Sequence, residues 1–565
     1  MKRLPFLMLP ITAYFLCALW SGASANPPIQ TMTAPVPPAG SEDGGFIPLW
    51  NSGDLPPFEP EPLPLMEPLP VRFDWRELGK VAPVKHQGSC GACYVFPPLA
   101  SVQAQLLIAG EPAFDFSENN VKECDWWQVN RGYVGSCRGG NSFMVANFLS
   151  VNGTVLESCD PYVPANVDCI DTCPYIKTLL GLRVLSLENV PPPELLKPYL
   201  YFHGPIAVAM SADHGYGGWP QEFDDYDGSY TLHYAGSGTL DHAVLIIGWD
   251  DTLSHAGGQG AWIVQNSHGS EWGGTCGYGT ERGYFTIAYG SALIGSYSFQ
   301  FCELRDYSAD EVVMHHDEAG PFKLIGYEGS NTAWGLCRFV PSDDMLLERV
   351  EIWSYDRLAD LDIYVYGDFD GTDVMDLLTS SLDNTTFEAG YHSFCLPQPV
   401  PVQSGDDFYA VAKVTLNSQE FPLTCDDFSD LSPNSSYISP EGSSGSWTLL
   451  TDTDLGIRVR ASRIMGAAGA EEAAAAVLSL ECRPGPGGIA KLSYAIPSAG
   501  RVRLAVHDVH GRLVRTLVDR PEPAGSYTEN WNGLSRQGSS AAPGVYFIRL
   551  EAGGQALTEK VVIMR

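Results

Sequence analysis

The stretch that decides the fold reads Pro83-Val84-Lys85-His86-Gln87-Gly88-Ser89-Cys90-Gly91-Ala92-Cys93-Tyr94. It contains the pattern Cys-Gly-(Ser/Ala)-Cys-(Trp/Tyr), in which Cys93 is the second cysteine. Apolar residues at helical spacing follow, among them Leu99, Val102 and Leu106, so Cys93 is expected to open a helix. A helix N-terminus lowers the pKa of a thiol and favours its nucleophilic anion. Cys93 is therefore a candidate nucleophile.

This pattern resembles the papain family of cysteine proteases, and the resemblance extends from Phe73 to about Tyr289. It implies that Cys93 attacks a peptide carbonyl and that His242, 149 residues later, serves as general base and acid. Asn266 would orient the His242 ring, as the third member of such a triad does. Gln87 would join the Cys93 backbone N–H in stabilising the oxyanion.

The same resemblance assigns four residues to substrate binding: Gly139, Gly140, Asp241 and Trp272. A wall formed by Gly139 and Gly140 has no side chains, so it can pair with an extended peptide.

Thirteen cysteines remain once the leader segment with Cys17 is removed, so at least one thiol stays unpaired. The resemblance implies that Cys90 pairs with Cys137 and leaves Cys93 free. Cys124 would pair with Cys169 or Cys173, and Cys159 would take the one left over. Six further cysteines have no connectivity fixed by the sequence: Cys276, Cys302, Cys337, Cys395, Cys425 and Cys482.

Three departures from the family pattern have physical consequences. His268 stands where the family has a Trp that shields the His–Asn hydrogen bond, which predicts a more exposed His242. Pro97 and Pro98 fall in the first turns of the expected helix and can kink it. Residues 250–260 lengthen what we expect to be a loop after the His242 strand.

Composition limits the partners and the compartment. The chain has 565 residues with 67 acidic and 33 basic side chains, a net charge of −34, which repels nucleic acid. Residues 1–25 combine Lys2 and Arg3 with an apolar run and Ala23-Ser24-Ala25, which predicts a cleaved signal peptide. We expect a secreted or cell-surface protein whose mature chain has no transmembrane segment.

The expected fold is multidomain: an α+β papain-like catalytic domain of two lobes followed by two all-β sandwiches. Alternating residues such as those at 362–366 favour a β-sandwich resembling lectin-like modules. Residues 506–514 and 544–547 resemble Ig-like C-terminal domains of bacterial surface proteins. The expected segments are a signal peptide (1–25), a Pro-rich tether or short propeptide (26–69), a peptidase domain (70–292), a lectin-like β-sandwich (296–464), an Ala/Gly-rich linker (465–477) and an Ig-like sorting or anchoring domain (478–565).

The favoured function is a secreted cysteine endopeptidase that acts on polypeptides through a thioester and needs no metal or organic cofactor. The β domains could hold a cell-surface or glycan ligand. One alternative is a surface binding protein with a vestigial peptidase domain. Another is a thiol-disulfide oxidoreductase, because Cys90 and Cys93 form a C-x-x-C pair. The acidic turn 368–373 does not follow the EF-hand spacing and is expected to be a solvated hairpin turn.

Overall fold

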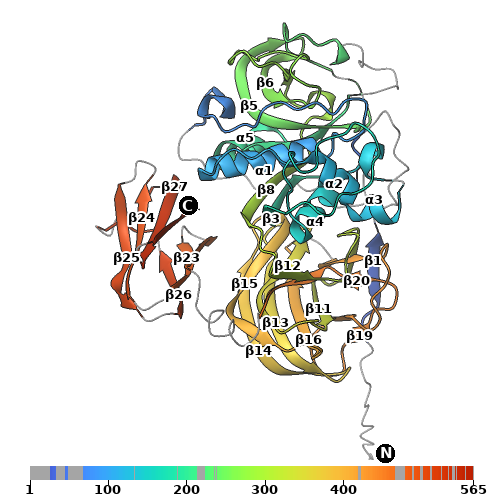
Figure 1. Cartoon of the computed structure of the whole chain (residues 1–565), viewed down its shortest axis with the longest axis vertical. Helices are drawn as coiled ribbons and strands as arrows, with labels where there is room; N and C mark the ends of the chain where they lie inside the picture. The colour runs from blue at the N-terminus through green and yellow to red at the C-terminus, as the bar shows by residue number, and fades with distance from the viewer. Residues whose placement is uncertain are drawn as a thin grey trace, which may run out of the picture.

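The computed structural model describes residues 26–33, 45–48, 68–132, 134–187, 189–212, 223–234, 236, 238–417, 421–464, 478–485, 489–496, 500–508, 512–522, 525–531, 533–536, 541–542, 544–553 and 555–563. Figure 1 shows a mixed unit at the top, a β-rich unit below it and a smaller β unit at the left. Among the residues described, α-helices occur only in the upper unit. The expected class, an α+β domain followed by all-β domains, is confirmed.

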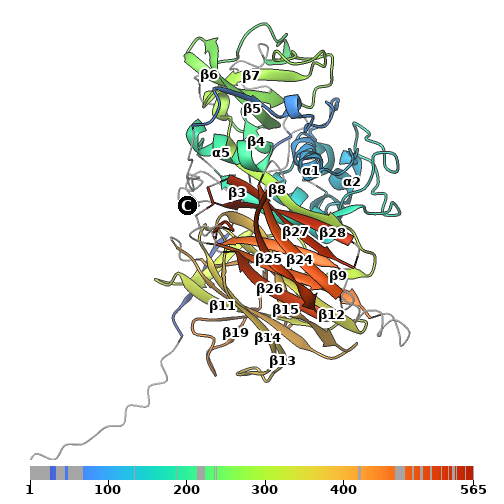
Figure 2. The ribbon, with the colours of Figure 1, turned by 90° about the vertical axis from the view of Figure 1, so that its left-hand side faces the viewer.

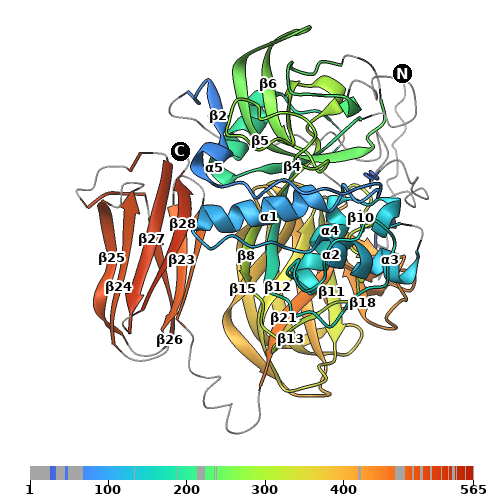
Figure 3. The ribbon, with the colours of Figure 1, turned by 45° about the horizontal axis from the view of Figure 1, so that its top comes forward.

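The upper unit has a helical lobe and a β lobe. Its helices are α1 (Phe96–Ala109), α2 (Glu118–Cys124), α3 (Trp126–Asn130), α4 (Ser142–Val151) and α5 (Pro193–His203), with 3₁₀ turns η1 (Trp75–Leu78), η2 (Ser136–Arg138) and η3 (Ser291–Leu293). Its strands are β2 (Arg72–Asp74), β3 (Lys177–Ser186), β4 (Ile206–Met210), β5 (His242–His255), β6 (Gly258–Gln265), β7 (Tyr284–Ala288) and β8 (Ser296–Asp306). In Figure 3, α1 lies between the strands of the β lobe and the strands of the lower unit.

Helix α1 begins at Phe96, three residues after Cys93, so the expectation that Cys93 opens the helix is wrong. The reason is the pair Pro97-Pro98, which has no N–H groups to donate to the carbonyls of Cys93 and Tyr94. The helical ladder therefore starts with the N–H of Leu99 bonded to the carbonyl of Val95 at 3.1 Å. Both prolines lie in the first turn, where they are tolerated.

Strands β5 and β6 form a long hairpin instead of the expected loop over 250–260. They remain paired almost to their tip, where Ser254 faces Gln259 and His255 faces Gly258. The lengthening of the chain after the His242 strand is thus accommodated by extending two strands. The base of the hairpin is buried around Trp249 and Trp262.

The lower unit is a β-sandwich. Its strands are β9 (Glu311–Met314), β10 (Lys323–Tyr327), β11 (Thr332–Phe339), β12 (Met345–Ser354), β13 (Asp360–Phe369), β14 (Val374–Thr385), β15 (Ala389–Val402), β16 (Phe408–Thr415), β17 (Leu423–Asp426), β18 (Ser436–Ser439), β19 (Thr448–Leu449), β20 (Asp454–Leu455) and β21 (Ile457–Arg463). One sheet has the order β14-β13-β16-β11-β18-β19, and β15-β12-β21-β9 belong to another. Alternating inward residues such as Leu361, Ile363 and Val365 fill the core.

One sheet runs through both of these units. Strand β3 of the upper unit pairs antiparallel with β15 of the lower one, from Val184 opposite Ala389 to Gly181 opposite His392. The result is an 11-stranded sheet in the order β7-β6-β5-β4-β8-β3-β15-β12-β21-β9, with β2 attached to β5. Strand β8 pairs with β3 and β4, so it lies in the upper unit, beyond the expected boundary at residue 292. In Figure 2, β3 and β8 lie at the junction of the two units, behind the strands of the C-terminal unit.

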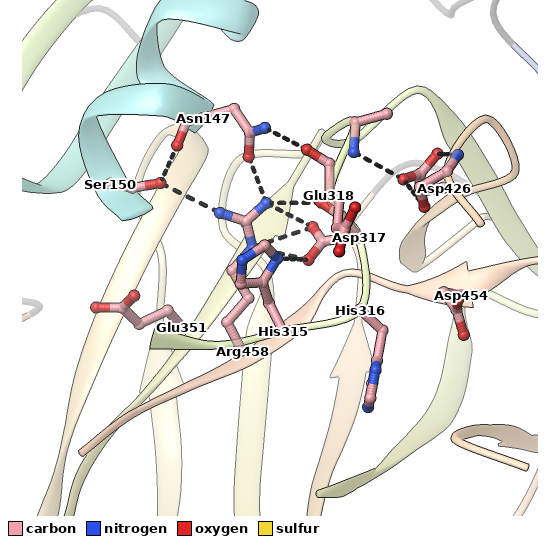
Figure 4. A network of polar contacts seen from close by, with 12 residues as sticks. Asn147, Ser150, His315, His316, Asp317, Glu318, Glu351, Asp426, Asp454 and Arg458 are labelled. Carbon is pink, nitrogen blue, oxygen red and sulfur yellow. Dashed lines mark hydrogen bonds and ion pairs between the residues drawn. The ribbon is translucent and has the colours of Figure 1, made fainter. Parts of the chain in front are cut away.

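A buried ion pair stabilises the contact between α4 and the lower unit (Figure 4). Arg458 on β21 donates from Nε to Asp317 Oδ1 and from Nη2 to Asp317 Oδ2, both at 2.8 Å, and neither residue is exposed to solvent. The same guanidinium reaches α4, where it donates to Ser150 Oγ at 3.2 Å and to Asn147 Oδ1. The amide of Asn147 donates to the carbonyl of Glu318 at 3.0 Å. Hydrogen bonds to Arg458 and Glu318 thus attach helix α4 to the lower unit.

Residues 26–33, at the other end of the chain, also join the lower unit. Strand β1 (Ile29–Thr33) pairs antiparallel with β10 along its whole length, from Ile29 opposite Tyr327 to Thr33 opposite Lys323. It is the edge strand of a sheet in the order β1-β10-β17-β20. This part of the Pro-rich stretch is therefore ordered on the sandwich.

The smaller unit is a second sandwich, with strands β22 (Ser479–Gly485), β23 (Ile489–Ile496), β24 (Gly500–Asp508), β25 (Leu513–Glu522), β26 (Gly525–Trp531), β27 (Gly544–Ala552) and β28 (Gln555–Ile563). Its sheets are β22-β23-β26 and β25-β24-β27-β28. Val502, Leu504 and Val506 face its core, as their alternation predicts.

The expected signal peptide and the linker 465–477 lie outside the described residues. Within the described ranges, no helix is both long and apolar enough to cross a membrane.

Candidate active site

Cys93 lies where the helical lobe meets the first residue of β5. Its side chain is completely buried, and its Sγ accepts a hydrogen bond from the backbone N–H of Ala243 at 3.4 Å. Because Ala243 follows His242 directly, the thiol lies at the start of the strand that carries the candidate base.

His242 and Asn266 meet because β5 and β6 run antiparallel: His242 begins β5, and Asn266 follows the end of β6. The ring atom Nε2 of His242 lies 2.9 Å from Asn266 Oδ1, and both side chains are buried. The backbone N–H of Ser267 donates to the same Oδ1 at 2.8 Å and fixes the amide. With Nε2 bonded to Asn266, Nδ1 is the ring nitrogen that remains for proton transfer with a thiol.

Several aromatic rings surround His242, including His268, which stands at the position of the family's Trp. The ring of His268 lies 5.2 Å from that of His242, and Phe223 lies 5.9 Å from His242. Trp272 packs on His268 at 5.3 Å and donates its indole N–H to the carbonyl of Asp224. His242 is only 2% exposed, so the prediction that His268 leaves it open to water is wrong in this state. Substrate contact by Trp272 stays a prediction.

Gln87 is bound to the turn that carries Asn266. Its backbone N–H donates to the carbonyl of Ser267 at 2.8 Å, and its side-chain oxygen accepts from Ser267 Oγ. Its side-chain N–H donates to the carbonyl of Cys90 at 3.0 Å. Ser267 therefore positions both Gln87 and Asn266. No sequence pattern predicts this role for Ser267, although it directly follows Asn266.

The cleft is occupied by residues 45–48 of the chain itself. The N–H groups of Gly45 and Phe46 both donate to the carbonyl of Asp241, at 3.0 and 3.2 Å. Gly140 donates to the carbonyl of Gly45 at 3.1 Å and accepts from the N–H of Ile47 at 2.8 Å, a parallel bridge. Gly140 and Asp241, two predicted substrate-binding residues, thus bind a peptide in the structure.

Gly45 lies directly on the nucleophile. A Cβ atom at Gly45 would overlap Cys93 Sγ, which leaves no space for a substrate there. Gly140 is equally restricted, since its Cβ would meet the ring of Tyr94 at 2.7 Å. Gly139 has φ 90°, a left-handed conformation that favours glycine, and it contributes no bond to the bound segment among those described.

This occupancy reverses the expected pKa of the nucleophile. Burial, with a smaller contribution from the nearby Asp241 carboxylate, raises the pKa of Cys93 to about 12. Backbone hydrogen bonds from Ala243 and from Gly45 itself lower the pKa of Cys93, but they do not compensate for the burial. The expectation of a lowered thiol pKa is therefore not met while residues 45–48 cover the thiol.

The disulfides confirm the expected pairing of Cys90 with Cys137 and resolve the open choice. Cys124 pairs with Cys169, and Cys159 pairs with Cys173. Cys93 keeps its thiol, as do the six cysteines left open above. Because Cys90 is bonded to Cys137, the C-x-x-C pair of an oxidoreductase does not form.

One group of carboxylates in the described part of the chain has the spacing of a cation site. Asp360, Asp362 and Asp383 lie close enough to share an ion, but Asp362 already pairs with Lys413 at 3.0 Å. In the acidic turn, Asp370 accepts backbone hydrogen bonds from Thr372 and Asp373, as a hairpin turn does.

Comparison with known proteins agrees with this geometry. Residues 69–306 match the papain family cysteine proteases, residues 313–459 a lectin-like domain, and residues 487–555 the FlgD Ig-like domain. Procathepsin L of Mus musculus is 32% identical over 226 residues, 40% of this chain and 62% of the relative. A cysteine proteinase of Trypanosoma brucei brucei is also 32% identical over 226 residues, 39% of this chain and 44% of the relative. The chain thus spans less than two thirds of the length of these curated relatives.

A solved structure shares the first two domains. The cysteine protease and lectin-like domains of Cwp84, a surface layer associated protein of Clostridium difficile, superpose with a TM-score of 0.60 at 18% identity. The match covers 77% of this chain and 98% of the other and shows a common fold. A cysteine-to-alanine variant of the same protease after propeptide cleavage gives 0.57 at 18% identity, over 69% of this chain and 99% of the other. This chain therefore carries a papain family cysteine protease domain, followed by a lectin-like domain and a FlgD Ig-like domain.

Proposed function

We propose that the protein is a secreted cysteine endopeptidase that hydrolyses polypeptides at Cys93. The observation that carries the proposal is that Gly140 and Asp241 already bind an extended peptide across this thiol. The hydrogen bond between His242 and Asn266 supports a base held in one orientation. A peptide-binding wall beside a thiol and an oriented imidazole has the parts that acyl transfer requires.

In the proposed reaction, His242 removes the proton of the Cys93 thiol, and the sulfur attacks the carbonyl of the scissile bond. The Gln87 amide and the Cys93 backbone N–H stabilise the oxyanion. His242 then protonates the leaving amine, and a thioester remains. Water deprotonated by His242 hydrolyses the thioester, releases the acid and restores the thiol. No step uses a metal or an organic cofactor.

The structure described corresponds to the closed state in this proposal. The carbonyl of Gly45 accepts from Gly140 on the cleft wall, whereas the side-chain N–H of Gln87 donates to the carbonyl of Cys90. The segment is thus bound without presenting its carbonyl to the oxyanion donors, which supports inhibition over cleavage. Turnover requires that residues 45–48 leave the cleft.

The test is hydrolysis of casein by the chain lacking residues 1–67. Cys93→Ala should abolish turnover and retain the thermal unfolding profile. The matched control is Cys276→Ala, which removes a half-buried thiol that also forms no disulfide. Loss of activity in the control, or activity retained in Cys93→Ala, would contradict the mechanism.

Iodoacetamide labelling separates the enzyme from a surface binding protein with a vestigial peptidase domain. In the shortened chain, an active site predicts selective alkylation of Cys93 well below pH 7, because a thiolate–imidazolium pair reacts where ordinary thiols are protonated. A vestigial site predicts an ordinary thiol with a pKa near 8.5. Mass spectrometry identifies the labelled cysteine in either case.

Secretion and surface location are part of the proposal. The support is the predicted signal peptide, the three disulfides, which persist in oxidising compartments, and the fold shared with a surface layer associated protein. The lectin-like and Ig-like domains would hold the enzyme at a cell-surface or glycan ligand. Fractionation of the producing cells tests this location.

A further inference from the structure

Two short pieces of the N-terminal stretch bind to two different domains. Residues 26–33 lie on the lectin-like domain, and residues 45–48 lie in the cleft of the peptidase domain. Residues 34–44 connect the pieces, and residues 49–67 connect the second piece to the peptidase domain. The cleft-binding piece therefore has an attachment on each side.

The attachment to the lectin-like domain is a complete edge strand. All five residues of β1 pair with β10, and the N–H of Glu328 continues the contact to the carbonyl of Pro28 at 3.4 Å. The side-chain amide of Asn26 donates to the carbonyl of Ser446 at 2.8 Å. Ile29 packs against the sandwich core. Such main-chain pairing gives affinity to a strand added at a sheet edge.

The contact in the cleft is shorter but well buried. Four backbone hydrogen bonds join residues 45–47 to Asp241 and Gly140. Phe46 and Ile47 are 4% and 5% exposed, and the Phe46 ring meets Tyr297 edge-on at 5.5 Å. An isolated peptide with so few contacts loses most of its binding energy to the entropy of association. Attachment at a nearby site removes most of that cost.

We propose that the lectin-like domain regulates the peptidase by holding the inhibitory segment 45–48 at the cleft through strand β1. The inference rests on the proposed function, because it concerns the control of that same site. A cut within residues 49–67 leaves the segment connected to β1, and a cut within 34–44 leaves it connected to the peptidase domain. Full activation then requires both a cut and the release of β1.

The degree to which residues 45–48 keep the cleft closed depends on their connection to β1 through residues 34–44. Residues 34–44 are a short connection, and a short connection keeps a tethered segment at an effective concentration on the order of millimolar. The singly cut chain therefore retains a closed cleft at any protein concentration used in an assay, whereas the released fragment dilutes with the sample. Breaking the β1 contact should raise the accessibility of Cys93 at least about tenfold.

The experiment uses the full chain from Asn26 with a recognition site for a serine protease placed within residues 49–67. Gln30→Pro/Thr31→Pro removes two backbone donors, one of which faces β10 because donors alternate along a strand. Gln30→Ala/Thr31→Ala is the matched control that retains both donors. A synthetic peptide with the sequence of residues 26–33 competes with β1 in the unchanged chain and needs no variant.

Two measurements follow the cut. In the Cys93→Ala background, size-exclusion chromatography tests whether the N-terminal fragment co-elutes with the rest. With Cys93 present, iodoacetamide labelling measures how far the thiol is uncovered. The fragment should co-elute and labelling should stay slow in the cut chain and in the alanine control. In the proline variant, or with excess peptide, the fragment should separate and labelling should reach the rate of the chain that starts at Pro68.

Separation of the fragment with β1 intact would overturn the proposal, as would slow labelling in the proline variant after the fragment has separated. The two proposals can fail separately. If the chain from Pro68 hydrolyses nothing and its Cys93 reacts as an ordinary thiol, the proposed endopeptidase function is wrong. Co-elution in the Cys93→Ala background still tests the attachment through β1, because it does not depend on activity.

Discussion

Replacing Arg458 by Met should destabilise the peptidase and lectin-like domains together. The guanidinium is fully buried and makes a two-point contact with Asp317, which is also fully buried. Removing one partner of a buried pair leaves an uncompensated charge and costs about 3–5 kcal/mol. The bonds to Asn147 and Ser150 are lost as well, so we expect a decrease of about 4 kcal/mol in the free energy of unfolding.

The pH dependence identifies Asp317 as the source of the loss. Burial already raises the pKa of Asp317, and Arg458 is the main group that opposes this shift. Without Arg458 the folded-state pKa rises further above the unfolded value, so the folded protein binds a proton more readily. The deficit should be full at neutral pH and shrink as the pH falls through the raised pKa. Asp317→Asn in the same background should recover part of the stability at neutral pH.

The assay is denaturant unfolding followed by tryptophan fluorescence, in the Cys93→Ala background to prevent self-digestion. Arg463→Met is the matched control, because Arg463 lies on the same strand and its pair with Asp343 is exposed. Exposed pairs contribute about 0–1 kcal/mol. An Arg458→Met deficit as small as that of the control, or one that does not change between neutral and acidic pH, would refute the reasoning.

Three further outcomes can be checked. Gln87→Ala in the chain lacking residues 1–67 should lower kcat by about 10²–10³ with little change in KM, because one oxyanion donor is lost; steady-state kinetics decides, and an unchanged kcat removes Gln87 from this role. Cys90→Ser/Cys137→Ser opens a loop with a sequence separation of 47 and should cost about 4 kcal/mol in denaturant unfolding; a loss below about 1 kcal/mol would contradict this. Gly140→Ala should raise KM more than it lowers kcat, since its Cβ would push the wall away from the Tyr94 ring at 2.7 Å; a normal KM would show that the wall does not bind substrate.

The sequence was most informative where chemistry restricts residue type. The pattern around Cys93 and the order of Gln87, His242 and Asn266 predicted which residues the structure brings together. The expected start of α1 is wrong because the apolar spacing after Cys93 carries no information about backbone donors. The missing N–H groups of Pro97 and Pro98 decide where the helix begins.

Long-range pairing was the part that sequence patterns did not give. Nothing in the alternation of β15 indicates that its partner is β3 of another domain, because either edge of a strand offers the same backbone groups. Phe46 and Ile47 are two apolar residues in a Pro-rich stretch, too few for a periodic signal, yet both are buried. Their role depends on a cleft that only the folded peptidase domain provides.

The sheet shared through β3 and β15 joins the cleft to the lectin-like domain by paired strands, so we expect the two to move together. A ligand bound to the lectin-like domain would then set the orientation of the cleft relative to that ligand. Substrates would then be selected by where their cleavable loops stand relative to the anchoring point as well as by their sequence. Calorimetry should accordingly record a single melting transition for both domains.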